Sequence, residues 1–174
     1  LPELIALAKK DPDKLNYGSA GNATSPHLGT ELLAREAGIK MVHIPFSGAA
    51  PAITALLAGN IDVLCADLPV VMQQVSRGVK IVSVNSTKRS DALPNVPTTA
   101  ELGLPNVVAD SNYGMIAPKG LPPAIMQKMR DAVFETLKTP SVVAALAGQG
   151  SAPAPTTAEE YRRLMQSESV RWGR

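Results

Sequence analysis

The sequence predicts an α/β fold built on a mainly parallel sheet with helices on both faces. Short apolar segments typical of strands alternate with helical segments along residues 1–85. Glycine or proline stands at the junctions, as at Gly38, Pro45 and Gly59. Hydrophobic residues make up 45% of the 174 residues and aromatic residues only 3%, which fits helices packed on a sheet better than an aromatic-rich β-sandwich.

The elements of this first part follow one another in strand–loop–helix order. A helix with an apolar face opens the chain and ends at Asp11-Pro12, because a residue before proline disfavours helical backbone. Thr24-Ser25-Pro26 starts the next helix, since a hydroxyl at the cap and a proline in the first turn are common start signals. The predicted helices are 3–10, 24–38, 47–57 and 67–78, and the predicted strands are 15–19, 41–44, 61–66 and 80–85.

The second part of the chain has a different composition. Residues 86–106 contain Pro94, Pro97 and Pro105, which predict a connector with a short helix at 99–102. No apolar run in the chain approaches the roughly 20 residues that a membrane-spanning helix needs. Beyond the connector we expect a strand at 113–117 and helices at 122–137, 141–147 and 157–172.

Charge and cysteine content argue against several classes of protein. The net charge is +2 and the basic residues occur in scattered pairs, whereas nucleic-acid binding needs a concentrated basic face. Two distant histidines and the single Cys65, expected in the core, predict no metal site. Residues 18–23 lack the third glycine of a dinucleotide fingerprint, so we expect no cofactor.

The candidate site is a set of loops that follow predicted strands. Ligands of open α/β sheets gather outside the carboxyl ends of parallel strands, where loops 19–26, 45–51 and 66–69 belong. The first loop offers hydroxyl groups, a glycine and an asparagine that tolerate unusual backbone angles, and the positive start of a helix, which together suit an anion. The candidate ligand-binding residues are Ser19, Ala20, Gly21, Asn22, Ala23, Thr24, His27, Ser47 and Asp67.

Several of these residues also have structural interpretations. Ser19 and Thr24 are residue types common in turns, and Asp67 is placed to cap the next helix. His27 lies in the first helical turn, where it can serve a structural hydrogen bond. A small α/β enzyme acting on an anionic substrate at the same helix N-termini and an interaction or signalling module are the alternatives to a binding protein. We predict no catalytic residues, because no Gly-x-Ser-x-Gly elbow is present.

Several motifs together resemble the Bug receptors, the TctC-like substrate-binding proteins of tripartite tricarboxylate transporters. Residues 15–28, Leu-Asn-Tyr-Gly-Ser-Ala-Gly-Asn-Ala-Thr-Ser-Pro-His-Leu, are similar to the family segment NYxSxGxGTxxHL. Residues 43–48 resemble HVPYKG, and residues 59–69 resemble GxVDxxFDxLP. The resemblance continues in order through nearly the whole chain. It departs from the family pattern at Ala23, where the second loop glycine is usual, and at Asn112-Tyr113, where an aromatic pair is common.

The resemblance implies a two-lobed periplasmic receptor that captures a small organic anion and delivers it to membrane transporter subunits, without catalysis. Residues 1–108 would form the second lobe, with a periplasmic-binding-protein-like fold, and residues 109–174 the C-terminal part of an incomplete first lobe. The implied ligand is a dicarboxylate, a tricarboxylate or an amino acid, held by loop amides and hydroxyls, and the family aspartate falls on Asp67. We also expect self-association through the incomplete lobe, whose helices would otherwise expose apolar faces.

Overall fold

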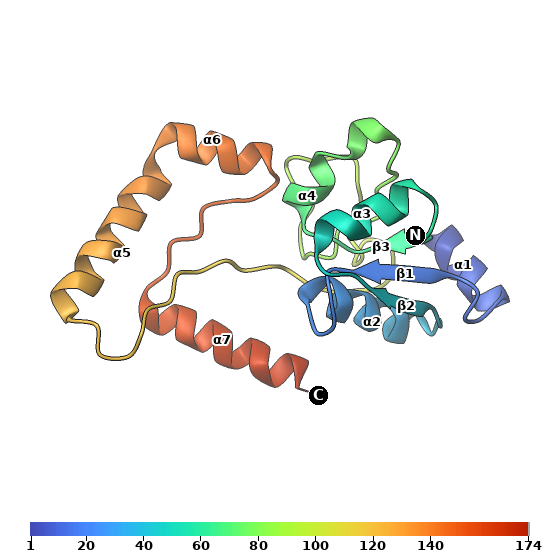
Figure 1. Cartoon of the computed structure of the whole chain (residues 1–174), viewed down its shortest axis with the longest axis horizontal. Helices are drawn as coiled ribbons and strands as arrows, with labels where there is room; N and C mark the ends of the chain where they lie inside the picture. The colour runs from blue at the N-terminus through green and yellow to red at the C-terminus, as the bar shows by residue number, and fades with distance from the viewer. Residues whose placement is uncertain (174) are drawn as a thin grey trace. The chain divides into compact units, whose positions relative to one another are not determined.

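The chain divides into two compact units, Leu1–Ser111 and Asn112–Arg174, in a computed structural model that describes residues 1–173 (Figure 1). The first unit contains a parallel sheet and its helices, which confirms the predicted α/β class. The second unit contains helices joined by irregular segments. The assignment of these units to the two lobes of a receptor stays a prediction.

The sheet has three parallel strands in the order β2-β1-β3. The central strand β1 (Asn16–Ser19) pairs along its whole length with β2 (Val42–Pro45) and through two residues with β3 (Val63–Leu64). Two side chains reinforce the short β1–β3 ladder. The Asn16 N–H donates to Asp62 Oδ2 at 2.9 Å, and the Asp62 N–H donates to Asn16 Oδ1 at 3.0 Å. This reciprocal pair fixes the register at the start of β1.

Two helices cover opposite faces of this sheet. α2 (Ser25–Ala37) connects β1 to β2, and α3 (Ala49–Leu57) connects β2 to β3. The two connections run in opposite directions along the sheet, and crossovers between parallel strands are right-handed. The two helices must therefore lie on opposite faces, as Figure 1 shows.

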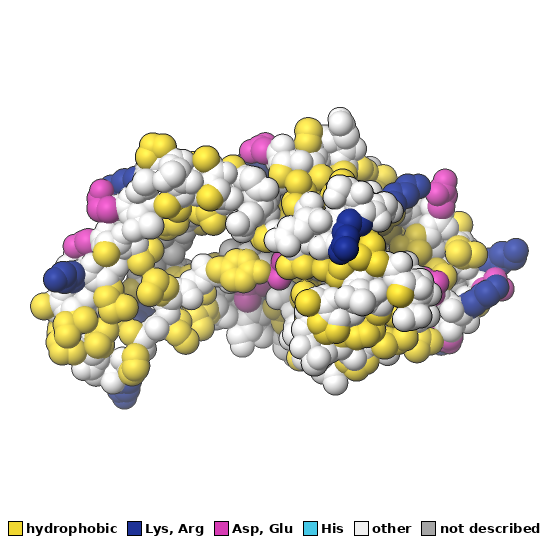
Figure 2. Space-filling model, turned by 45° about the horizontal axis from the view of Figure 1, so that its top comes forward, with side chains coloured by type: hydrophobic (Ala, Val, Ile, Leu, Met, Phe, Trp, Pro, Cys, Tyr) yellow, Lys and Arg dark blue, Asp and Glu magenta, His cyan; other side chains and the backbone are white. Residues whose placement is uncertain are grey.

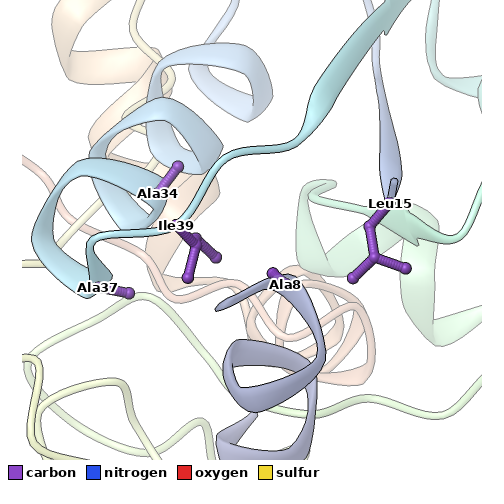
Figure 3. Close-up of a cluster of buried hydrophobic side chains, with 5 residues drawn as sticks. All are labelled: Ala8, Leu15, Ala34, Ala37 and Ile39. Carbon is purple, nitrogen blue, oxygen red and sulfur yellow. The ribbon is translucent and has the colours of Figure 1, made fainter. Parts of the chain in front are cut away.

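A small apolar cluster joins α1 (Pro2–Lys10) to the end of α2 (Figure 3). Gly38 ends α2 in a left-handed conformation with φ 63°, and the Ile39 N–H then returns to the Ala34 carbonyl at 2.9 Å. This turn directs the Ile39 side chain into the cluster. The buried members of the cluster are Ala8, Leu15, Ala34, Ala37 and Ile39.

Two predicted strands are wrong. In the predicted strand 80–85, only Val84 forms a bridge, to Thr98. The Val84 N–H donates to the Pro97 carbonyl, and the Val84 carbonyl accepts the Thr99 N–H, so both backbone groups are bonded to the connector. The neighbouring β3 is two residues long and offers little ladder to extend. Residues 113–117 form no strand, since no segment of residues 1–173 pairs with them and a strand needs a partner for its N–H and C=O groups.

Two predicted helices are also shorter or absent. The predicted helix 67–78 is broken into α4 (Leu68–Met72) and a 3₁₀ turn, η1 (Val75–Arg77), which Gly78 ends with φ 88°. The predicted short helix at 99–102 is a turn, in which the Leu102 N–H donates to the Thr99 carbonyl at 3.1 Å.

The second unit has helices but no buried core among its described residues. α5 (Pro123–Lys138), α6 (Pro140–Gly148) and α7 (Ala158–Trp172) lie within a few residues of their predicted positions. Thr157 and Glu160 form a capping box that starts α7. No residue of 112–173 is buried, and Met115, Ile116 and Val170 are 68%, 81% and 60% exposed. Figure 2 shows many hydrophobic side chains on the surface of this unit. The predicted self-association through this region stays a prediction.

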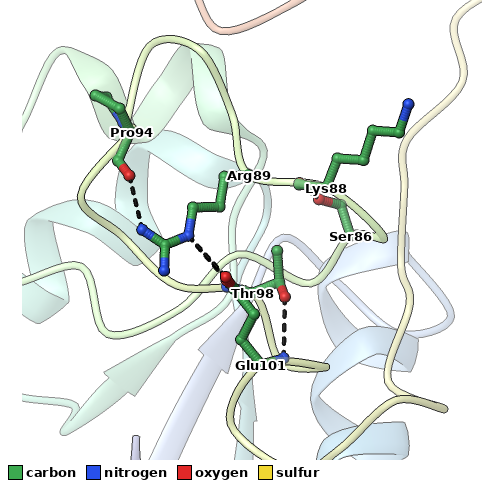
Figure 4. A network of polar contacts seen from close by, with 6 residues as sticks. All are labelled: Ser86, Lys88, Arg89, Pro94, Thr98 and Glu101. Carbon is green, nitrogen blue, oxygen red and sulfur yellow. Dashed lines mark hydrogen bonds and ion pairs between the residues drawn. The ribbon is translucent and has the colours of Figure 1, made fainter.

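An ion pair organises the connector at residues 86–106 (Figure 4). The Arg89 Nε donates to both carboxylate oxygens of Glu101 at 2.9 and 3.0 Å, and its Nη1 donates to the Pro94 carbonyl at 2.9 Å. The same carboxylate accepts the Thr98 N–H at 2.8 Å. The hydrogen bonds from Arg89 and Thr98 lower the pKa of Glu101 to about 2.

We expect Glu101→Gln to reduce the dependence of stability on acid pH. The lowered pKa means that the ionised Glu101 stabilises the fold above pH 4.5, the ordinary value, and that this contribution is lost as pH falls toward 2. Denaturant unfolding at pH 7 and at pH 2.5 measures the effect. The gap between the two free energies of unfolding should be smaller in the variant than in the parent chain. Glu135→Gln on α5 is the control, and an equal effect of both changes would contradict the assignment.

Candidate functional site

A pocket of about 370 Å³ opens at the carboxyl edge of the sheet, where the chain leaves β1 and β3. The chain turns toward α2 after one strand and toward α4 after the other, and the strand order reverses here. Open α/β sheets bind ligands at such reversal points. The lining residues are Ala20, Ala23, Thr24, Ser25, Pro26, Ala49, Leu64, Cys65, Ala66 and Asp67.

The loop between β1 and α2 has an unusual backbone. Gly21 has φ 132°, and Ala23 has φ 59°, in the left-handed region that alanine rarely adopts. The Thr24 hydroxyl donates to the Gly21 carbonyl at 2.7 Å, and the Thr24 N–H donates to the same carbonyl at 3.4 Å. These bonds curl the loop, so that Ala20, Ala23 and Thr24 face the pocket.

Ser19 supports the loop from below. Its side chain is fully buried, and its Oγ lies 2.7 Å from His43 Nε2. The Gly21 N–H donates to this Oγ at 3.2 Å, and the Ser19 hydroxyl donates to the Gly21 carbonyl at 3.1 Å. Ser19 therefore holds the backbone of the glycine and does not line the pocket.

His27 supports the same loop from the helix. Its Nδ1 accepts the Ala23 N–H at 3.1 Å. Its ring stacks on His43, with ring centres 4.1 Å apart and planes inclined by 21°, and His43 stacks in turn on Tyr17 at 4.8 Å. The Tyr17 hydroxyl donates to Glu31. The two histidines thus form a stacked pair beneath the loop.

Burial and neighbouring charge disfavour the charged forms of two of these groups. Burial, and then the nearby His27, lower the pKa of His43, and Glu31 opposes this in part. Burial, and then the hydrogen bond to Glu31, raise the pKa of Tyr17, so its hydroxyl remains a donor at physiological pH. The rings of Tyr17 and His43 are therefore favoured in their uncharged forms.

Asp67 and Cys65 form the opposite wall. The Asp67 carboxylate accepts a hydrogen bond from the Ser111 hydroxyl. It caps α4 by position but not by a side-chain hydrogen bond to the helix. Burial raises the pKa of the Cys65 thiol to about 11, so the group stays a neutral thiol rather than a nucleophilic thiolate.

The structure brings together only part of the predicted set. Ala20, Ala23, Thr24 and Asp67 line the pocket. Asn22 and Ser47 are exposed, and neither is among the lining residues. The candidate list omitted lining residues at the starts of α2 and α3 and at the end of β3. Most of them lie within the loops 19–26, 45–51 and 66–69, which the sequence had already placed at this edge of the sheet. The residues missed are Ser25, Pro26, Ala49, Leu64, Cys65 and Ala66.

Metal-ligand clusters and membrane-spanning helices are both absent from the part of the chain that the structure describes. Across residues 1–173, no three side chains of His, Cys, Asp or Glu are grouped as metal ligands. Over the same residues, no helix combines the length and the apolar character needed to cross a bilayer.

The fold and the pocket define a ligand-binding α/β unit of the kind found in solute receptors. The chain belongs to the tripartite tricarboxylate transporter receptor family, TctC, whose family model matches residues 1–174. This confirms the resemblance inferred from the motifs.

Two curated relatives come from bacteria. The chain is 38% identical over 165 residues to the UPF0065 protein in the gbd 5' region of Cupriavidus necator, which covers 94% of this chain and 50% of that protein. It is 33% identical over 173 residues to protein BugT of Bordetella pertussis, which covers 99% of this chain and 53% of that protein. The chain spans about half the length of these relatives.

Solved structures share the fold over almost the whole chain. A structure of a periplasmic transporter has a TM-score of 0.92 at 34% identity, with 99% of this chain and 58% of that chain covered. An R. palustris protein with adipate has a TM-score of 0.95 at 28% identity, with 99% and 58% covered. MatC from Rhodopseudomonas palustris with bound malate has a TM-score of 0.86 at 28% identity, with 99% and 60% covered.

We expect opposite effects from two substitutions in the loop. Gly21→Ala should lower stability by about 1–3 kcal/mol, because φ 132° is a region that only glycine populates readily. Ala23→Gly should raise stability by up to about 1 kcal/mol, since left-handed backbone costs alanine about 1–2 kcal/mol and the freedom of glycine in the unfolded chain offsets part of this. Denaturant unfolding measures both changes.

The control for the second change is Ala50→Gly in the first turn of α3. There the backbone is helical, and glycine should destabilise the chain by about 0.5–1 kcal/mol. If Ala23→Gly destabilised the chain as much as Ala50→Gly does, the strain at Ala23 would be disproved.

Proposed function

We propose that this chain forms one wall of a carboxylate site in a periplasmic solute receptor that delivers its ligand to a tripartite tricarboxylate-type transporter. The observation that carries the proposal is the pocket at the reversal point of the sheet, which is lined by the first residues of α2 and α3. The first N–H groups of a helix lack intrahelical partners and lie at the positive end of its dipole. Two such helix ends beside one pocket suit carboxylate oxygens.

The charges around the pocket restrict the ligand further. No Lys or Arg is among the described residues that line it, so an anion would be held by backbone N–H groups and hydroxyls. Asp67 contributes a negative charge, which repels a second carboxylate placed next to it. It accepts a hydrogen bond from a ligand hydroxyl, an ammonium group or an ordered water. The ligand we propose is a small dicarboxylate, preferably a hydroxy acid, and two similar proteins were solved with malate and with adipate.

The proposed activity is binding without catalysis. Ser19 is hydrogen-bonded to Gly21 and within hydrogen-bond distance of His43, but its side chain is fully buried, so the Ser19–His43 contact offers no exposed nucleophile. The Cys65 thiol is neutral because burial raises its pKa to about 11. The family to which the chain belongs consists of transporter receptors.

We expect titration calorimetry with succinate and malate to distinguish the contributions of Thr24 and Asp67, which lie on opposite walls of the pocket, in two variants of the 174-residue chain. Thr24→Val should weaken both ligands about fivefold to tenfold, because it removes a hydroxyl that holds the loop or meets the carboxylate, and Thr24→Ser should restore binding. Asp67→Asn should reduce the preference for malate over succinate, since the hydroxyl loses a charged acceptor while the anion loses a repelling charge.

Thr54→Val is the matched control. Thr54 lies on α3 with its hydroxyl bonded to the Ala50 carbonyl at 3.1 Å and is not among the lining residues. Its variant should bind both acids like the parent chain. Failure of both acids to bind, or equal effects of Thr24→Val and Thr54→Val, would refute the proposed site.

A further inference from the structure

The hydrogen bond between the loop and His27 has only one possible direction. The Ala23 backbone N–H is a donor, so the Nδ1 atom 3.1 Å away must carry a lone pair and no proton. A proton on Nδ1 would abolish the bond. A positively charged imidazolium has protons on both ring nitrogens, so the bond exists only while the His27 ring is neutral.

The neighbouring contact of His43 behaves differently. Its Nε2 lies 2.7 Å from the Ser19 hydroxyl, which donates or accepts. This contact therefore persists whether or not His43 carries an extra proton. Only the Ala23–His27 bond depends on protonation.

The surroundings of the pair oppose a second positive charge. His27 and His43 stack with ring centres 4.1 Å apart, so charge on both would be repulsive. Tyr17 is uncharged and bonded to Glu31, whose carboxylate is the negative group that acts on His43. Burial and the nearby His27 lower the pKa of His43.

The position of His27 in the helix adds a further constraint. It lies in the first turn of α2, next to Pro26, where a cation is unfavourable because the dipole is positive. Its contact resembles a capping box, in which the side chain in this turn accepts a backbone N–H ahead of the helix. α7 has the usual form with Glu160, which gains no positive charge. In α2 the acceptor is an imidazole nitrogen, which loses its lone pair when it takes up a proton.

We infer that His27 is a positioning residue that latches the binding loop through the Ala23 N–H, and that protonation of its ring releases the loop and weakens anion binding as pH falls. This inference rests on the proposed carboxylate site. Ala23 lines the pocket and has the strained φ of 59°, so it is the residue that would move when the bond is lost. Acidification thus favours release of a captured anion.

The first test follows the Ala23 amide by NMR hydrogen exchange in the ligand-free chain between pH 5 and 8. Its protection factor should fall about fivefold toward pH 5 in the parent chain. His27→Asn should remove this dependence, because the Asn carbonyl accepts in place of Nδ1 and cannot titrate. His27→Phe keeps a ring on His43 but lacks the acceptor, so protection should be low at every pH. His43→Gln should keep the parent profile.

Two results would overturn the latch. One is a flat pH profile of Ala23 protection in the parent chain, and the other is full protection in His27→Phe at pH 7.5. Both readouts are independent of any ligand. The dispersed amide spectrum of each variant verifies that it folds.

The second test compares malate affinity of the parent chain with that of His27→Asn at each pH, because this ratio cancels the titration of malate itself. Parent affinity should fall about fivefold relative to the variant from pH 7.5 to pH 5. A constant ratio, or a ratio that rises because a charged ring attracts the anion, would reject the coupling to binding. Absence of malate binding to both chains at every pH would reject the proposed carboxylate site. The protection factor of the Ala23 amide would still show whether His27 holds the loop.

Discussion

The pairing of the central strand β1 with both of its neighbours is the interaction on which the rest of the first unit depends. It places the ends of β1 and β3 side by side, with the start of α3 beside them. The Asn16–Asp62 pair reinforces the weaker side of this arrangement, where only two residues form ladder pairs. Right-handed crossovers then send the helices to opposite faces and leave one edge open. The pocket is a consequence of this topology rather than of any single side chain.

Much of this topology could be predicted because its signals are local. Proline in the first turn and a glycine at the end marked α2, and the alternation of short strand-like segments with helical segments marked β1 and β2. The predictions that failed concern segments whose state depends on a distant partner. Val84 uses its backbone groups on the connector near Thr98, and residues 113–117 have no partner strand within residues 1–173. An apolar run of five or six residues does not reveal its partner.

The candidate site was predicted at the level of loops and less well at the level of side chains. Loop 19–26 lies at the pocket, but the backbone angles at Gly21 and Ala23 decide which side chains face it. Ser19 and His27 carry polar groups suited to a ligand, yet they hold the loop from beneath. Cys65 was expected in the core and is mostly desolvated, but it also lines the pocket wall. Such roles depend on contacts between residues far apart in sequence, which no spacing rule encodes.

The left-handed backbone of Ala23 makes the effect of a substitution at this residue depend on His27. Glycine is usual at this position in the segment that the loop resembles, and glycine needs no outside help to adopt φ 59°. With alanine there, the bond to the imidazole offsets part of the strain, so the effects of changes at 23 and 27 are not additive. A chimaera that joins this loop to the helix of a relative should therefore exchange residues 23–27 as one block.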